Sequence, residues 1–272
     1  MANNERCILL LGSGDTLGVP VVGCSCATCK TDKRKRFGLY IKYQGINILI
    51  DTSPDLKQAF LENHLDFNDI DYIFISHTHT DHINGLGELS YRKSIPVYYP
   101  NDPINTRNMQ YFQYLENEGV LKKYPYAPYE KISLTPEIQV TPLPLNHGFP
   151  TCGFVIQLGE TKVGIMSDTN SKLSTEVLEA FTGCDYLYLD AFSENWRQIE
   201  GLYQQIGEKR TKEEIQASWF HTTIDEIPEI QKHLQAKKLI LVHLSHLVDL
   251  HQNLMIKYPN YYIGYDGMKI DL

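Results

Sequence analysis

Residues 77–82 constrain this chain more than any other feature of its sequence. The run His77-Thr-His79-Thr-Asp81-His82 places three histidines and one aspartate within six positions. In an extended loop, alternate side chains point to opposite sides, so His77 and His79 share one side while Asp81 and His82 turn into the following segment. Nitrogen and oxygen donors at this density are typical of a metal site. One short loop can therefore serve two metal ions.

Apolar segments that end in an aspartate or a histidine recur along the chain. They are residues 47–50 before Asp51, 72–76 before His77, 138–145 before Asn146-His147, 162–167 before Asp168 and 239–242 before His243. Helical patterns lie between them, as in mixed α/β proteins. Open α/β sheets place their ligand sites at the carboxyl ends of strands. We therefore predict one α/β domain over residues 1–272, with these ends at one edge.

The run 77–82 and three later strand ends together supply seven donors. They are His77, His79, Asp81, His82, His147, Asp168 and His243. A catalytic zinc uses about three protein ligands plus water, so seven donors are too many for one ion. The sequence predicts two catalytic divalent ions bridged by a carboxylate. Such donors accept manganese, zinc or iron, and intrinsic affinity does not decide which ion a cell supplies.

A second group of donors is the triplet Cys24-Ser-Cys26-Ala-Thr-Cys29. Three thiolates in a tight loop at residues 24–29 favour zinc over magnesium or calcium. A closed structural zinc site needs a fourth donor, and His246, three residues after His243, is the candidate. The alternative is three free cysteines without a metal.

Charge and hydropathy exclude several partners. The chain carries 25 lysines and arginines against 33 aspartates and glutamates, a formal net charge of −8, which disfavours DNA and large RNA. No run approaches the roughly 18 apolar residues of a membrane-spanning helix, and residues 1–6 do not resemble a secretory leader. We expect a cytoplasmic protein without a membrane partner. The four basic residues 33–36 are interpreted as a solvated turn, with contact to a nucleotide phosphate as the alternative.

Two segments do not fit the strand pattern. Residues 101–131 are rich in tyrosine and interrupted by prolines, and residues 194–212 are polar. Long irregular segments in compact domains are usually functional or mobile. We interpret both as insertions or flaps over a site. A surface excursion is the alternative for the second, and a homodimer contact is the alternative for the first.

The donor pattern resembles that of the metallo-β-lactamase superfamily. Residues 77–82 are similar to its H-x-H-x-D-H signature, and the later single His, Asp and His follow in the same order. The resemblance covers residues 8–270 and implies a four-layer αβ/βα sandwich. It implies that one ion binds His77, His79 and His147, that the other binds Asp81, His82 and His243, and that Asp168 bridges them. It also implies that Asp51 braces the site, and Asp190 is similarly placed.

Further short motifs are similar to the PhnP-type phosphodiesterases of that superfamily. They are Gly12-Ser-Gly14, Gly18-Val-Pro20, Gly23-Cys24-Ser-Cys26, Thr141-Pro-Leu-Pro-Leu-Asn-His147, Val242-His243-Leu-Ser-His246 and Gly264-Tyr-Asp-Gly-Met268. Those enzymes hydrolyse cyclic phosphodiesters. In that subgroup a cysteine triplet and a later histidine hold a structural zinc, which matches Cys24, Cys26, Cys29 and His246.

The resemblance implies a small phosphodiester or nucleotide-like substrate, such as a phosphoribosyl cyclic phosphate or a cyclic nucleotide. A hydroxide held between the ions is expected to attack phosphorus in line. Asp81 would orient or deprotonate the water, and Asp168 would bridge the ions. His221 matches an extra histidine of the subgroup and precedes a helix-capping motif, so we expect it to bind phosphate or protonate the leaving group.

Other functions share the same donors. Thioester hydrolysis, lactam hydrolysis and RNA 3′-end processing are the rival reactions, but lactamases and glyoxalases do not use the cysteine triplet, and a tRNA-processing enzyme needs a larger basic surface. A non-catalytic accessory protein of cofactor biosynthesis is the alternative of another class. Missing metal donors would indicate such an accessory protein, whereas every donor position is filled in this sequence.

Overall fold

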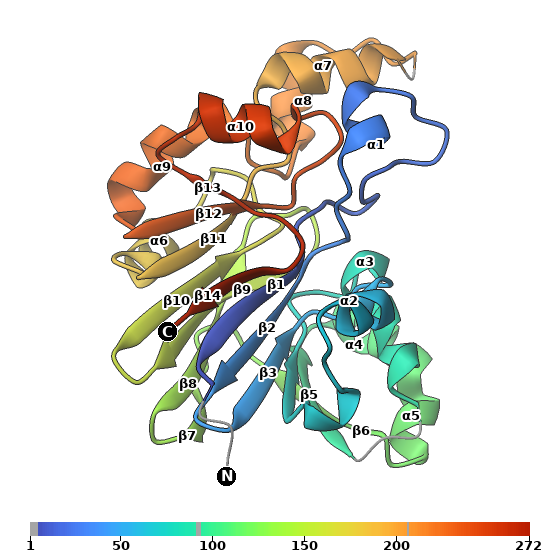
Figure 1. The fold of residues 1–272 in the computed structure, drawn as a ribbon, viewed down its shortest axis with the longest axis vertical. Coiled ribbons are helices and arrows are strands. Elements are labelled where there is room, and N and C mark those ends of the chain that lie inside the picture. The colour runs from blue at the N-terminus through green and yellow to red at the C-terminus, as the bar shows by residue number, and fades with distance from the viewer. Residues whose placement is uncertain (1–4, 91–93, 206) are drawn as a thin grey trace.

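Two mixed sheets of seven strands each lie face to face in the computed structural model, which describes residues 5–90, 94–205 and 207–272. Helices cover the outer face of each sheet (Figure 1). The strand order is β14-β1-β2-β3-β4-β5-β6 in the first sheet and β13-β12-β11-β10-β9-β8-β7 in the second. These layers form the αβ/βα sandwich of the metallo-β-lactamase fold, which confirms the predicted fold class.

The strands of the first sheet are β1 (Cys7–Gly12), β2 (Gly38–Tyr43), β3 (Ile46–Ile50), β4 (Tyr72–Phe74), β5 (Ile95–Pro100), β6 (Leu121–Tyr126) and β14 (Met268–Asp271). Those of the second are β7 (Ile132–Thr135), β8 (Ile138–Leu145), β9 (Thr151–Leu158), β10 (Thr161–Met166), β11 (Tyr186–Asp190), β12 (Lys238–Val242) and β13 (Tyr262–Ile263). Parallel pairs join β3 through β6 and β10 through β13, and the other pairs are antiparallel.

The helices are short. They are α1 (Ala27–Thr31), α2 (Leu56–Glu62), α3 (Thr80–Ile83), α4 (Pro103–Met109), α5 (Gln113–Asn117), α6 (Thr175–Phe181), α7 (Trp196–Gln205), α8 (Lys212–Ser218), α9 (Ile227–Leu234) and α10 (His251–Lys257), with 3₁₀ turns η1 (Phe67–Asp69), η2 (Asn84–Leu89), η3 (Gln110–Phe112) and η4 (Ile224–Glu226). No helix in the described ranges is long and apolar enough to cross a bilayer.

The core has one layer between the sheets and one under each set of helices. Strand β1 shows how one segment serves two layers, because its successive side chains point to opposite faces. Ile8 and Leu10 pack between the sheets, while Leu9 and Leu11 pack under the helices of the first sheet. A strand buried on both faces reads as a continuous apolar run, which is why the strand segments were recognisable in the sequence.

The five predicted strand ends do converge, but they belong to two sheets. Strands β3 and β4 come from the first sheet, and β8, β10 and β12 come from the second. The prediction that all five strand ends lie at the edge of one sheet is therefore wrong, because the ends come from both sheets and meet at the same end of the sandwich. Asp51, Asp168 and His243 each follow a strand with a φ of 57° or 58°, a strained conformation for residues other than glycine that clusters at functional sites.

Both segments that were expected to be irregular are structured. Residues 101–131 contain α4, η3 and α5, and they end in β6, which pairs with β5 in parallel. Residues 194–212 contain α7 and lead into α8, with residue 206 outside the described residues. Tertiary packing overrides the prolines, because β6 is an edge strand where a missing N–H is tolerated. That these two segments are insertions stays a prediction. The domain limits 1–272 also stay a prediction, and residues 1–4 lie outside the described ranges.

Gly12 at the end of β1 gives a direct test of this packing. A β-carbon there would lie 1.9 Å from the carbonyl oxygen of Arg36, so Gly12→Ala must displace the backbone next to β2. Overpacking costs about 1–3 kcal/mol, and we expect a fall in Tm of several degrees by calorimetry. Gly201→Ala in α7 is the control, because nothing lies within 4 Å of its β-carbon position. An unchanged Tm for Gly12→Ala would contradict the close approach.

Candidate metal centre

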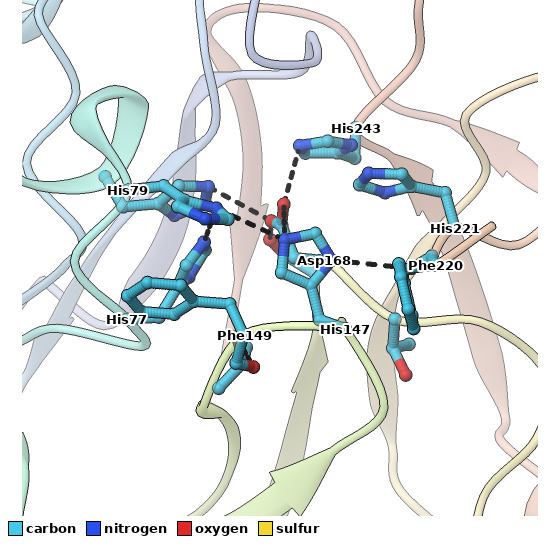
Figure 2. Close-up of polar contacts among 12 residues, drawn as sticks. His77, His79, His147, Phe149, Asp168, Phe220, His221 and His243 are labelled. Carbon is cyan, nitrogen blue, oxygen red and sulfur yellow. Dashed lines mark hydrogen bonds and ion pairs between the residues drawn. The ribbon is translucent and has the colours of Figure 1, made fainter. Parts of the chain in front are cut away.

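The seven predicted donors meet at the ends of the two sheets, and Figure 2 shows His77, His79, His147, Asp168 and His243 among them. His77 and His79 lie in the loop after β4, and Asp81 and His82 lie in α3. The remaining three follow strands of the second sheet, with His147 after β8, Asp168 after β10 and His243 after β12. The structure thus brings together every nitrogen and oxygen donor that the sequence singled out, although their binding of metal stays a prediction.

The first group of donors consists of three histidines. His79 is at its centre, with its Nδ1 atom 2.8 Å from Nε2 of His77 and 3.3 Å from Nε2 of His147. The ring of Phe149 covers one side, at 4.4 Å from the ring of His79. The donor atoms of the three histidines lie within 4.8 Å of one another, an arrangement that suits the ligands of one metal ion.

The second group contains Asp81, His82, Asp168 and His243, and all four are buried. The Nε2 atom of His82 lies 3.2 Å from Asp81 Oδ2 and 3.1 Å from Asp168 Oδ2. The other oxygen of Asp168, Oδ1, lies 3.1 Å from Nε2 of His243. The same oxygen is 3.7 Å from Nε2 of His147 in the first group. Asp168 therefore contacts both groups, which is the position of a bridging carboxylate.

The hydrogen bonds among the donor residues are incomplete, which favours metal ions as the missing partners. The Nε2 atoms of His82 and His243 are buried and have no hydrogen-bond partner in the described residues, although carboxylate oxygens lie close by. Buried polar atoms without partners are rare because they are costly. Ligand atoms 2.0–2.2 Å from a tetrahedral zinc lie about 3.3–3.6 Å apart, close to the separations around Asp168. The residues thus fit two divalent cations.

Two further aspartates hold the imidazoles in place. Asp51 accepts hydrogen bonds from His82 Nδ1 at 2.8 Å and from the backbone N–H of Ser76 at 2.7 Å. Asp190 accepts one from His221 Nδ1 at 2.7 Å. Carboxylates of this kind fix the tautomer and orientation of a histidine. Asp51 therefore braces the centre, as the resemblance implied, and Asp190 braces His221.

His221 lies at the edge of the centre. Its ring stacks on the ring of His243 at 4.9 Å and 10°, and one of its nitrogens lies within 4.8 Å of donor atoms of His147 and Asp168. The capping motif after it forms, but the side chains of Thr223 and Glu226 bond the backbone N–H groups of that turn. Those N–H groups are not free for a phosphate, so His221 itself is what faces the site.

The histidines differ in how their surroundings affect their pKa values. Burial lowers the pKa of His77 far below its usual value and that of His147 to about 4. Burial also opposes the charged forms of His82 and His243, but Asp168 overcomes it. The pKa of His82 is raised well above its usual value, and that of His243 is raised to about 9.

The cysteine triplet and His246 form a separate cluster whose donor atoms lie within 4.8 Å of one another. Nδ1 of His246 is 3.3 Å from Cys24 Sγ and 3.7 Å from Cys26 Sγ. All the cysteines are free of disulfides. Three sulfurs and one nitrogen fit a closed tetrahedral zinc site. The loop from His243 to His246 joins this cluster to the first centre.

The basic residues 33–36 are not a solvated turn. Arg34 is only 4% exposed, pairs with Asp32 at 2.7 Å and donates to the backbone carbonyl of Ser245 at 2.9 Å. The neighbouring Lys35 pairs with Glu62, and Arg36 pairs with Asp55 at 3.0 Å. Arg34, Lys35 and Arg36 are therefore already paired with carboxylates. Arg34 contacts the loop that carries His246 through the carbonyl of Ser245.

Asn105 is a residue that the sequence analysis missed. It is fully buried in α4, and its Oδ1 atom accepts hydrogen bonds from the N–H and the hydroxyl of Thr78, at 2.8 and 2.7 Å. Its Nδ2 atom donates to the carbonyl of Pro150 at 2.8 Å. It thus ties the His77–His79 loop to the loop after His147. No spacing in the sequence marks it, because Thr78 and Pro150 lie 27 and 45 residues away along the chain.

Comparisons with known proteins agree with this arrangement. The sequence model of the family described as "Beta-lactamase superfamily domain" matches residues 46–244. An octanoyltransferase of Porphyromonas gingivalis is 30% identical over 282 positions, which cover 97% of this chain and 51% of that protein. The chain therefore spans about half the length of that relative. A ribonuclease Z of Phocaeicola vulgatus is 21% identical over 305 positions, which cover 93% of this chain and 97% of the relative.

Solved structures give the same picture. A crystal structure described as a new diphosphatase from the PhnP family has a TM-score of 0.78 and 26% identity, with 98% of both chains covered. Zinc-bound PqqB from Methylobacterium extorquens has a TM-score of 0.82 at 16% identity, over 98% of this chain and 100% of that one. The short form of human tRNase Z has a TM-score of 0.71 at 19% identity, over 97% and 98% of the two chains. The last two show likeness of fold alone.

Metal binding should release protons. Because their pKa values are raised, His82 and His243 are protonated at neutral pH in the metal-free protein, and each must lose its proton to become a ligand. Affinity should therefore rise as the pH rises toward the pKa of His243, at about 9. Titration calorimetry with Mn²⁺ in buffers of different ionisation enthalpy measures the release. Affinity that is the same at pH 6 and pH 8 would contradict it.

Asn105→Ala should weaken the centre without removing a ligand. It leaves the N–H of Thr78 and the carbonyl of Pro150 without their partner, so the two ligand loops lose their shared anchor. Loss of such supporting contacts typically costs 10- to 100-fold in metal affinity, which competition with a chelator measures. Arg107→Ala is the matched control, since Arg107 is exposed in the same helix. Equal affinities for the two variants would show that Asn105 does not position the loops.

Proposed function

The chain belongs to the metallo-β-lactamase superfamily as a PhnP-like hydrolase, and on that basis we propose that it opens a small cyclic phosphodiester with two divalent cations. One observation carries the proposal. Asp168, which contacts both donor groups, and His221, which rests on Asp190, line the same cleft of about 500 Å³. A phosphate and a leaving group can therefore reach the metal donors and a proton donor together.

The chemistry of a phosphodiester explains why such a site is needed. The substrate carries negative charge that repels a nucleophile, and its leaving alkoxide is poor. When bound, two cations neutralise that charge and lower the pKa of a water molecule. The residues that would hold them are His77, His79, Asp81, His82, His147, Asp168 and His243.

Two side chains of the cleft would move protons. Asp81 is a buried carboxylate at the cleft wall, and it would orient the attacking water and accept its proton. Because Asp190 holds Nδ1 of His221, Nε2 is the nitrogen left for the substrate. The new bond forms between the water oxygen and phosphorus, the bond from phosphorus to the ring oxygen breaks, and His221 gives that oxygen a proton. The hydrogen bond to Asp190 keeps the His221 ring oriented for this transfer.

The names of related proteins support a phosphate ester as the substrate class. The diphosphatase of the PhnP family and ribonuclease Z act on phosphate bonds by their descriptions. The octanoyltransferase is twice as long as the region it shares with this chain, so its name does not assign acyl transfer to that region. A cluster of donors that fits a structural zinc, Cys24, Cys26, Cys29 and His246, also favours the PhnP branch.

A small substrate fits the electrostatics better than an RNA. The net charge is −8, and Arg34, Lys35 and Arg36 are all paired with carboxylates. Binding to the backbone of an RNA depends on free lysines and arginines that neutralise phosphates. We therefore propose a mononucleotide-sized diester. A linear diphosphate and a thioester belong in the assay as the rival substrate classes.

His221→Ala should slow the reaction according to the leaving group. Loss of a general acid costs about 10²- to 10⁴-fold, so steady-state hydrolysis of a 2′,3′-cyclic nucleotide should fall by that factor. A diester with a p-nitrophenolate leaving group needs no proton and should be affected far less. His233→Ala, an exposed histidine of α9, is the control, and metal content is measured in each variant.

Two results would contradict the proposal. An equal loss on both substrates with full metal content would remove the acid role from His221. A wild-type enzyme that leaves cyclic diesters intact but cleaves the diphosphate or the thioester would overturn the substrate class.

A further inference from the structure

A second cleft adjoins the one at the metal centre. It has a volume of about 690 Å³ and is bounded by α3, η2, η3 and α5. Thr78, Thr80 and Asn108 line both clefts, so the two are continuous. The Nδ2 atom of Asn108 donates to the hydroxyl of Thr78 at 3.0 Å, which fixes Asn108 at the junction. Figure 1 shows α3 and α4 on the same side of the first sheet.

The far wall of this second cleft is aromatic. Tyr111 and Tyr114 line it, and their exposures are 78% and 46%. Phe112, which packs edge-on against Tyr111 at 5.2 Å and 84°, is buried and supports it. Gly87 leaves room opposite, since the hydroxyl of Tyr114 is the only neighbour found within 4 Å of its β-carbon position among the described residues. A large aromatic side chain that is exposed beside a cleft offers an apolar face that a planar ligand can cover.

We propose that this second cleft binds a planar base of the substrate, stacked on Tyr111, while the phosphate lies at the metal centre. The inference rests on the proposed function, because it places the phosphate there. It narrows the substrate to a cyclic phosphodiester that carries a nucleobase. Stacking suits any base, because every base presents a π face.

Charge and space support a base over other occupants. The residues that line the second cleft are neutral, namely Thr78, Thr80, Ile83, Asn84, Gly87, Asn108, Tyr111, Phe112 and Tyr114. A second phosphate would find no cation there, whereas an uncharged ring with polar edges would meet tyrosine faces and the amides of Asn84 and Asn108. The segment 101–131, which forms this wall through η3 and α5, would then determine the choice of substrate.

The test compares two substrates that share the cyclic phosphate. Adenosine 2′,3′-cyclic phosphate carries a base, and methyl riboside 2′,3′-cyclic phosphate does not. Wild type should prefer the first by at least about fivefold in kcat/KM, the lower end of what base stacking provides. Tyr111→Ala should bring that ratio close to one, and Tyr111→Phe should keep it. Tyr262→Ala, an exposed tyrosine of β13, is the control and should also keep it.

A binding measurement separates this inference from the proposed function. The fluorescent nucleoside 2-aminopurine riboside has no phosphate, so it binds without any hydrolysis. The wild type and Tyr111→Phe should quench it in a saturable titration, and Tyr111→Ala should bind it at least about fivefold more weakly. Such quenching with no hydrolysis of either diester would support the base site while overturning the proposed reaction. Equal kcat/KM for both diesters, or quenching that Tyr111→Ala leaves unchanged, would overturn the base site.

Discussion

The buried carboxylate of Asp168 is the contact on which the rest of this site depends. Its two oxygens lie 3.1 Å from imidazoles of His82 and His243, which come from opposite sheets of the sandwich. A carboxylate and histidines this deeply buried are costly unless charge and hydrogen bonds compensate for lost water. Asp51 meets part of that cost by accepting a hydrogen bond from His82. Both ring nitrogens of His243 have no hydrogen-bond partner in the described residues, so the donor geometry leaves the remaining compensation to cations.

The backbone is arranged around the same requirement. Asp51, Asp168 and His243 follow their strands in the left-handed region, a strained conformation that clusters at functional sites. The loop after β12 then continues from His243 to His246, so it contributes to the cysteine cluster as well. Arg34 fixes that loop through the carbonyl of Ser245. A zinc at the cysteine cluster would therefore stabilise the position of His243, so that binding at one proposed site would affect the other through this loop.

The sequence predicted the donors and the α/β class because both leave local signals, whereas the four-layer sandwich was implied by the family resemblance. Strands buried on both faces read as apolar runs, and Asp168 or His243 directly after such a run marks a strand end. It could not show that the strand ends lie on two sheets, since that depends on contacts far apart in the chain. Strand β6 was missed because prolines are tolerated at a sheet edge, and the burial of Arg34 was missed because only tertiary packing supplies its partners. Asn105 and Tyr111 lacked any motif for the same reason.

Metal content measured by mass spectrometry on the purified wild type and two variants tests the central claim most directly. If Asp168 joins two ions and the cysteine cluster holds a third, Asp168→Asn should lose the two ions of the first centre and keep one zinc. Cys26→Ser should lose that zinc and keep the other two. A wild type that binds a single ion under saturating conditions, or an Asp168→Asn variant with unchanged metal content, would contradict the account.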